Sequence, residues 1–325
     1  MLNLTRIKSL ASLVLLVTLM TGCTEQSPKE KAQIQVKAKL EPLVSTQWLS
    51  DNLNSPGLVI LDSSVFIDFK DGQMASRSGK ENYLAGHIPG ARFADLKDKL
   101  SATHPTFEFV MPSPDEFAKE LGELGVSNDS RVVIYSTDNQ SWSARLWWMM
   151  RWAGLEQVAI LDGGLKAWKE EGRELSNQPQ SFSKTEFTPS INPQLIADEK
   201  EVSLAISNEQ IEIVDALSAG HYAGKVSMYP RAGHITSATN IPMSELFQPS
   251  THYRPIDELD LQFDGDRNKR VITYCGGGVA ASSLAFTMYR LGYKDVAVYM
   301  GSLQEWTANS ENPMTLGDKP QKDAK

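Results

Sequence analysis

The chain has 325 residues, which is long enough for two domains of ordinary size. Hydrophobic residues make up 41% and charged residues 22%, a balance that is normal for a soluble globular protein with a sizeable core. The formal net charge of −8 disfavours general nucleic-acid binding, which requires a basic face.

The first residues have the pattern of an export signal. Arg6 and Lys8 form a short basic region, and the apolar run that follows over 10–20 is too short to span a bilayer, which takes ~20 residues. The run ends in the sequence MTGC, which resembles a bacterial lipobox in which Cys23 is diacylated and becomes the new N-terminus. An ordinary secretory signal with an incidental cysteine is the alternative interpretation.

We therefore expect a lipoprotein signal peptide over 1–23 and a polar, flexible tether over 24–40. The lipid would anchor the protein to a membrane, with its domains in the periplasm. Thr24 stands where an inner-membrane retention signal would have Asp, which favours the outer membrane over the inner.

Two later segments contain the same motifs in the same order, with insertions between them. The paired motifs are LVILD (58–62) with IEIVD (211–215), GHIPGA (86–91) with GHITSA (233–238), VVIYS (132–136) with VITYC (271–275), and VAILDGGLKAW (158–168) with VAVYMGSLQEW (296–306). This repetition indicates that one domain has been duplicated.

Within each half, short β-branched runs alternate with helical stretches that stop at Gly154 or Gly292. Strands that alternate with helices predict an α/β fold, in which each domain is a mainly parallel sheet flanked by helices. Asp62 and Asp215 each end a strand, and we expect them to bind neighbouring backbone N–H groups. The tryptophans of one helical stretch are expected to pack in the core or at the domain interface: Trp147, Trp148 and Trp152.

The composition sets the domain limits. The first domain is expected over 41–177, a polar linker over 178–195 and the second domain over 196–312. The tail over 313–325 is polar and is expected to be disordered.

The most informative segment follows the strand 271–274, where Cys275 precedes three glycines and a helical stretch that begins near Val279. Ligands bind at such carboxyl ends of strands in open α/β sheets. The chain has two cysteines, so lipidation of Cys23 would leave Cys275 as the sole thiol and exclude an internal disulfide. The alternatives are a packed cysteine beside a turn, a phosphate-binding loop and a cysteine phosphatase.

Two of these alternatives disagree with the residues. The loop has no Gly-Lys-Ser/Thr ending for phosphate binding, and Ala281 stands where the Cys-x5-Arg loop of a phosphatase would have arginine. Glycines let successive N–H groups converge on one point, and the following helix N-terminus adds more. Such a cradle would stabilise a thiolate or a persulfide, and it is predicted at Gly276, Gly277, Gly278, Val279 and Ala280.

The GHIPGA motif, the strand with its Cys-x-x-Gly loop and the closing VAVYMGSLQEW resemble signatures of the rhodanese family over 41–312. The resemblance implies an inactive first domain, in which Ser136 takes the place of Cys275, and a catalytic second domain. The loop Cys-Gly-x-Gly is similar to that of members that use 3-mercaptopyruvate, whereas members with Arg after the cysteine tend to use thiosulfate. Gly277 and Ala280 replace two hydroxyl residues of that loop.

The same resemblance supplies candidate substrate-binding residues. Arg231 matches one arginine that binds the substrate carboxylate, and His221 stands where a second arginine is expected. His87 either faces the site from the first domain or fixes its own loop. The implied activity is sulfur transfer from 3-mercaptopyruvate or thiosulfate to cyanide or a thiol through a Cys275 persulfide, with no metal or cofactor. A non-catalytic module that binds sulfur, an oxyanion or a partner protein is the alternative.

Overall fold

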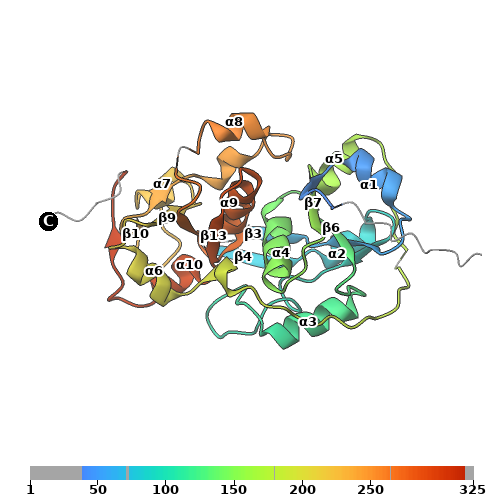
Figure 1. Cartoon of the computed structure of the whole chain (residues 1–325), viewed down its shortest axis with the longest axis horizontal. Helices are drawn as coiled ribbons and strands as arrows, with labels where there is room; N and C mark the ends of the chain where they lie inside the picture. Colours follow the sequence, from blue (N-terminus) through green and yellow to red (C-terminus); the bar gives the residue numbers. More distant parts are fainter. Residues whose placement is uncertain (1–38, 71–72, 179, 264, 319–325) are drawn as a thin grey trace, which may run out of the picture. The chain divides into compact units, whose positions relative to one another are not determined.

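The computed structural model describes residues 39–70, 73–178, 180–263 and 265–318 (Figure 1). The predicted signal peptide, Cys23 and the tether up to residue 38 lie outside the described residues. Among the residues that are described, no helix is long and apolar enough to cross a membrane.

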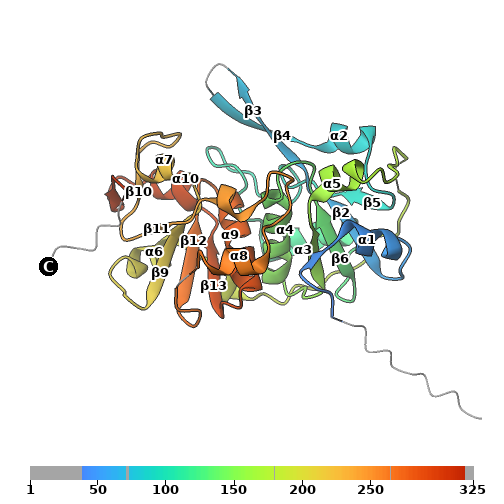
Figure 2. The same cartoon turned by 90° about the horizontal axis from the view of Figure 1, so that it is seen from above.

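Each half of the chain forms a five-stranded sheet in which all neighbouring strands are parallel (Figure 2). The first sheet has the order β1 (Leu43–Val44), β7 (Val158–Leu161), β6 (Arg131–Tyr135), β2 (Leu58–Asp62) and β5 (Ala91–Phe93). The second has β8 (Ile196–Ala197), β13 (Asp295–Tyr299), β12 (Arg270–Tyr274), β9 (Ile211–Asp215) and β11 (Thr239–Asn240). The two orders correspond strand for strand, which confirms the α/β fold and the duplication.

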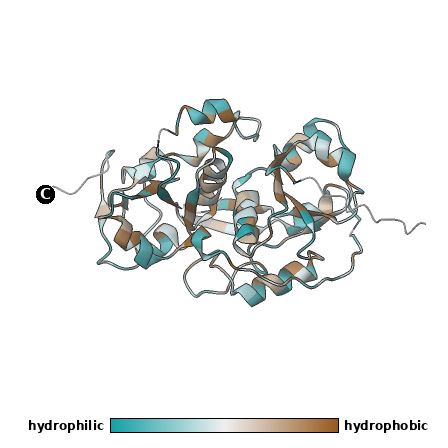
Figure 3. Cartoon of the chain, in the orientation of Figure 1, coloured by the Kyte–Doolittle hydropathy of each residue, from teal (hydrophilic) through white to brown (hydrophobic). Residues whose placement is uncertain are grey.

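Helices cover both faces of each sheet. Because successive strand residues point to opposite faces, Ile60 packs with one cluster of buried residues while Val59 and Leu61 pack with the other. The helices are α1 (Thr46–Asn52), α2 (Lys80–Ala85), α3 (Pro114–Glu123), α4 (Ser141–Trp152) and α5 (Gly164–Glu170) in the first half, and α6 (Glu199–Ala205), α7 (Ala219–Tyr222), α8 (Ile256–Asp260), α9 (Val279–Arg290) and α10 (Ser302–Trp306) in the second. Outlying helices such as α3 and α8 alternate hydrophilic and hydrophobic segments (Figure 3).

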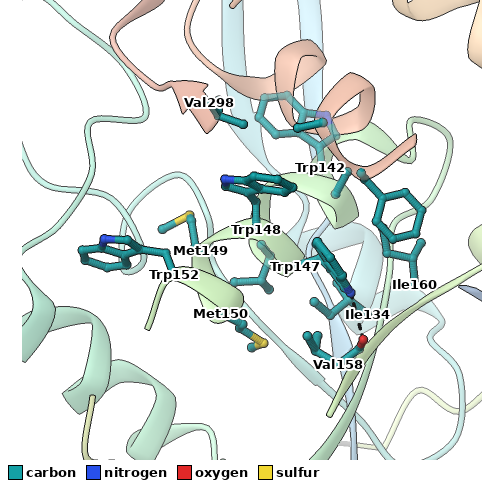
Figure 4. Packing of buried hydrophobic residues seen from close by; sticks show 14 of the residues in the cluster. Ile134, Trp142, Trp147, Trp148, Met149, Met150, Trp152, Val158, Ile160 and Val298 are labelled. Atoms are coloured by element: carbon teal, nitrogen blue, oxygen red, sulfur yellow. Dashed lines mark hydrogen bonds between the residues drawn. The ribbon is translucent and has the colours of Figure 1, made fainter. Parts of the chain in front are cut away.

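Helices α4 and α9 pack against each other and join the two halves, so that one cluster of buried residues contains side chains from both sheets. Trp147 of α4 lies 4.9 Å from the ring of Phe286 and 5.0 Å from that of Tyr289. Its Nε1 also donates to the carbonyl of Val158, 2.8 Å away (Figure 4). Trp147, Trp148 and Trp152 are all buried in this cluster, which confirms that they are packing residues.

Two antiparallel pairs were not expected from the sequence. Strands β3 (Val65–Lys70) and β4 (Gln73–Ser78) form a hairpin that extends from the first half (Figure 2). Strand β14 (Met314–Thr315) pairs with β10 (His234–Ile235) in the second. The prediction of a disordered tail is therefore wrong at residues 314–315, where ladder hydrogen bonds that the polar composition does not reveal hold the chain.

Buried carboxyl groups occupy equivalent positions in the two sheets. Asp62 Oδ1 accepts the N–H of Ser64 at 2.9 Å, and Asp215 Oδ1 accepts the N–H of Leu217 at 2.7 Å. This confirms their expected structural role. Burial raises the pKa of Asp62 to about 6 and that of Asp215 to about 7, against the opposing effect of these N–H donors.

Replacing Asp215 by asparagine is expected to change how stability depends on pH. Between the unfolded pKa of ~3.9 and the folded pKa of about 7, the unfolded chain releases a proton that the folded chain keeps, so this carboxyl lowers stability as pH rises. Asparagine keeps the acceptor for Leu217 and carries no charge. The free energy of unfolding of Asp215→Asn should therefore rise relative to wild type by about 2 kcal/mol between pH 5 and pH 6.5, as measured by urea denaturation. If the difference in free energy of unfolding between Asp215→Asn and wild type did not change with pH, this result would contradict a raised pKa of Asp215.

Candidate active site

Cys275 lies directly after β12 and is 2% exposed. Gly278, with a φ of +78°, is the N-cap of α9, and this left-handed conformation lets the chain turn from strand into helix. Ser302 at the start of α10 fixes the loop from the other side, because its Oγ accepts the Cys275 N–H at 3.1 Å and donates to the carbonyl of Tyr299 at 2.7 Å. The cysteine is therefore set at a rigid corner between a central strand and two helices.

The carbonyl groups of Cys275, Gly276, Gly277 and Gly278 each accept a hydrogen bond. Their donors, in chain order, are the N–H of Leu303 (3.0 Å), the N–H of Gln304 (2.9 Å), Nη1 of Arg145 (3.1 Å) and Oγ of Ser282 (2.7 Å). Since the N–H and C=O of a trans peptide point in opposite directions, the N–H groups of residues 276–279 point away from these donors. Among the described residues, no group outside α9 accepts a hydrogen bond from the N–H groups of residues 276–280.

Arg145, from α4 of the first half, reaches this loop across the interface. It is 0% exposed, and besides Gly277 it donates to the sulfur of Met300 at 3.4 Å and to the carbonyl of Phe109. Burial lowers the pKa of Arg145 to about 10, while the nearby Cys275 opposes this shift. The guanidinium is therefore still charged at neutral pH.

Tyr229 covers the loop at Gly276. A Cβ atom on Gly276 would lie 1.6 Å from the Tyr229 hydroxyl oxygen, so the phenol occupies the space that a side chain at this position would need. Burial, followed by the charge of Cys275, raises the pKa of Tyr229, and the phenol therefore stays protonated. Tyr229 presents a hydroxyl donor beside the cysteine loop.

The first half has the same backbone arrangement without the thiol. Ser136 follows β6 as Cys275 follows β12, and its carbonyl accepts the N–H of Leu165 at 3.0 Å, just as that of Cys275 accepts Leu303. The Ser136 hydroxyl donates to the carbonyl of Asn139 at 2.7 Å. The duplicated frame therefore holds a hydrogen-bonded serine in one half and a cysteine in the other.

The model of the rhodanese-like domain matches this chain twice, over residues 45–171 and 198–309. The chain belongs to the rhodanese family. Thiosulfate sulfurtransferase of Gallus gallus is 32% identical over 274 residues, which are 81% of this chain and 92% of the relative. The 3-mercaptopyruvate sulfurtransferase of Escherichia coli K12 is 32% identical over 277 residues, 83% of this chain and 96% of the relative.

A solved structure agrees with these relatives. The crystal structure of SseA, a 3-mercaptopyruvate sulfotransferase from Escherichia coli, superposes with a TM-score of 0.72 at 31% identity, covering 80% of this chain and 98% of that one. This rhodanese-family chain is a sulfurtransferase. Relatives named for either donor are equally similar, so the comparison leaves the donor open.

The three predicted substrate-binding residues lie in different settings. Arg231 donates through Nη1 to the carbonyl of Ser310 at 2.9 Å and through Nη2 to that of Asn312 at 2.7 Å. His221 shares a hydrogen bond of 2.8 Å with Ser218. Among the described residues, no hydrogen bond joins Arg231, His221 or His87 to the cysteine loop, and their predicted contact with substrate stays a prediction.

His87 has the environment of a residue that fixes its own loop. Its Nδ1 lies 2.7 Å from the carbonyl of Tyr83, and its ring stacks on that tyrosine at 4.0 Å. His234, the equivalent residue of the second half, makes the same pair of contacts with Tyr222, at 2.8 Å and 3.7 Å. Both halves share this geometry and only one has the cysteine. The geometry therefore belongs to the fold and is not specific to the half that has the cysteine.

Sequence reasoning missed Arg145 and Tyr229. Arg145 lies in a helical stretch whose apolar spacing predicts only packing, although a cation among so many apolar residues is a signal of another role. Tyr229 lies two residues before Arg231 in a segment without helical or strand periodicity, and nothing in the sequence places it at the loop.

Proposed function

We propose that this rhodanese-family enzyme transfers a sulfane sulfur through a persulfide on Cys275. The thiolate attacks the outer sulfur of the donor, a new S–S bond forms, and the bond between that sulfur and the rest of the donor breaks. Thiosulfate would leave as sulfite. 3-Mercaptopyruvate would leave as the enolate of pyruvate when its C–S bond breaks, and the enolate carbon would then take up the proton that the donor thiol releases. An acceptor thiol or cyanide then attacks the terminal sulfur and frees Cys275.

The observation that carries this proposal is the set of four anchored carbonyls from Cys275 to Gly278. Their anchoring leaves consecutive N–H groups without acceptors beside the only cysteine among the described residues. Unpaired N–H groups at a buried site are costly unless an anion or another acceptor takes them. A sulfur anion at Cys275 would satisfy that need before and after sulfur transfer.

We favour 3-mercaptopyruvate over thiosulfate as the donor. The glycine at position 276 supports this preference, since family members that use thiosulfate tend to have arginine there. Tyr229 adds a physical reason, because its hydroxyl fills the space into which a longer side chain at 276 would extend. The donor would therefore have to be recognised by residues outside the loop, with Arg231, His221 and His87 as candidates.

Mass spectrometry of the intact protein tests the persulfide directly. After incubation with 3-mercaptopyruvate or thiosulfate, the wild type is expected to gain one sulfur atom and to lose it again on addition of cyanide. The gain should be faster with 3-mercaptopyruvate at equal donor concentration. Turnover without a detectable gain of sulfur would contradict the persulfide, and a stable gain without turnover would favour a sulfur-binding module instead.

We also propose that the protein is attached to a bacterial membrane, with the outer membrane favoured, through a lipid on Cys23 and that its two domains lie in the periplasm. The basic region, the short apolar run and the MTGC sequence support this proposal. The polar segment that follows would act as a flexible tether between the lipid and the first domain.

A further inference from the structure

Arg145 is a buried cation that forms no salt bridge with a carboxylate in the part of the chain that the structure describes. Transfer of a charged group out of water is costly unless an opposite charge or a full set of hydrogen bonds compensates it. None of the ion pairs formed by the described residues includes Arg145. Its Nε is buried without a hydrogen-bond partner.

The hydrogen-bond acceptors of Arg145 among the described residues are neutral. Nη1 donates to the Gly277 carbonyl and to the Met300 sulfur, and Nη2 donates to the Phe109 carbonyl. The charge of Cys275, two residues before Gly277, favours the charged guanidinium. The cation is thus held by three neutral acceptors next to the one nucleophile of the loop.

We propose that Arg145 is a positioning residue that supplies the fixed positive charge opposing the sulfur anion on Cys275, so that the half without a cysteine contributes a working part of the active site. Amide dipoles converging on the sulfur weaken rapidly with distance, whereas a full charge in a dry interior acts over several ångströms. The same charge would serve the thiolate and the persulfide equally, because both are anions. This inference rests on Cys275 being the reacting sulfur.

The geometry also explains how the charge is kept in place. The packing of α4 against α9 fixes the start of the side chain, and the carbonyls of Gly277 and Phe109 fix its end. A Cβ atom on Gly278 would lie 2.8 Å from Arg145 Nη1, so a side chain at this position would displace the guanidinium. The guanidinium of arginine can donate to several acceptors at once, which the ammonium group of lysine does less well. Either side chain would supply the positive charge.

The test measures the rate of Cys275 alkylation by iodoacetamide against pH, because alkylation detects the thiolate without requiring sulfur transfer. In Arg145→Met, the pH midpoint of the rate is expected to rise by about one unit, which makes alkylation roughly tenfold slower below the midpoint. Arg145→Lys should recover most of the wild-type profile. Arg151→Met is the matched control, since Arg151 lies on the same helix and covers the rings of Trp147 and Tyr289.

A folded Arg145→Met protein with the wild-type midpoint would overturn the proposal. If that variant does not fold, the alkylation profiles of Arg145→Lys and Arg145→Gln are compared, because glutamine keeps a side-chain donor and carries no charge. Arg145→Lys should keep the wild-type midpoint and Arg145→Gln should raise it, and equal midpoints in the two variants would overturn the proposal. A wild-type protein that shows the expected alkylation profile but transfers no sulfur would contradict the proposed function and leave the role of Arg145 standing.

Discussion

Cys275→Ser is expected to lower the rate of sulfur transfer at least about a thousandfold with either donor. A serine hydroxyl is not ionised near neutral pH and cannot form the S–S bond that the proposed persulfide mechanism requires. The fold should be retained, because the loop is held by the Cys275 N–H and C=O and by its neighbours' backbone, none of which the substitution removes. A steady-state assay of cyanide or thiol sulfuration with 3-mercaptopyruvate and with thiosulfate measures the loss.

Ser136→Ala is the matched control for this experiment. Ser136 occupies the equivalent corner of the first half. Among the described residues, its hydroxyl bonds to the carbonyl of Asn139 in its own loop and to the hydroxyl of Ser143 in α4. Its removal should leave turnover within a few-fold of wild type. A comparable loss of sulfur-transfer rate in both variants would mean that the two corners act together. Equal rates in wild type and Cys275→Ser would show that Cys275 is not the nucleophile.

Gly278→Ala is expected to have the second largest effect, lowering the free energy of unfolding by about 3 kcal/mol and sulfur transfer at least about tenfold. The φ of +78° is strained for any residue with a Cβ atom. The added atom would also lie 2.9 Å from the Met300 carbonyl oxygen, which is backbone and cannot move freely. The cysteine loop would have to move to remove this close contact, and the N–H groups next to Cys275 would shift with it.

Gly277→Ala is the control that adds a Cβ atom to the same loop without the backbone strain and without the contact with the Met300 carbonyl oxygen. This neighbour is not in the left-handed region, and its Cβ atom would approach the end of the Gln304 side chain no closer than 3.3 Å. We expect a loss of stability below about 1 kcal/mol and near-normal turnover. Thermal unfolding and the sulfur-transfer assay on both variants measure the contrast. Equal behaviour of the two variants would show that the loop is looser than its hydrogen bonds indicate.

The contribution of the first half to the site has a structural consequence. The cysteine loop receives Arg145 from α4, and Gln304, which holds the Gly276 carbonyl, also exchanges two hydrogen bonds with the backbone of Glu108. Both contacts cross from one duplicated half to the other. The half without a thiol at the equivalent corner therefore helps to hold the cysteine loop of the other half in place.

The sequence by itself determined the duplicated α/β fold, the packing role of the tryptophans and the location of Cys275 at the end of a central strand. These features depend on interactions within a few residues: apolar runs that form strands, glycines that end helices, and a glycine loop that precedes a helix. Such patterns repeat in both halves, so each half supports the interpretation of the other.

Only the tertiary structure decided which side chains surround that cysteine. Arg145 is 132 residues from the carbonyl it binds, and Tyr229 comes from an irregular segment whose course depends on packing. The pairing of β14 with β10 was likewise invisible in a polar tail. Contacts between distant segments arise from how whole elements pack, and no local pattern of residue types records them.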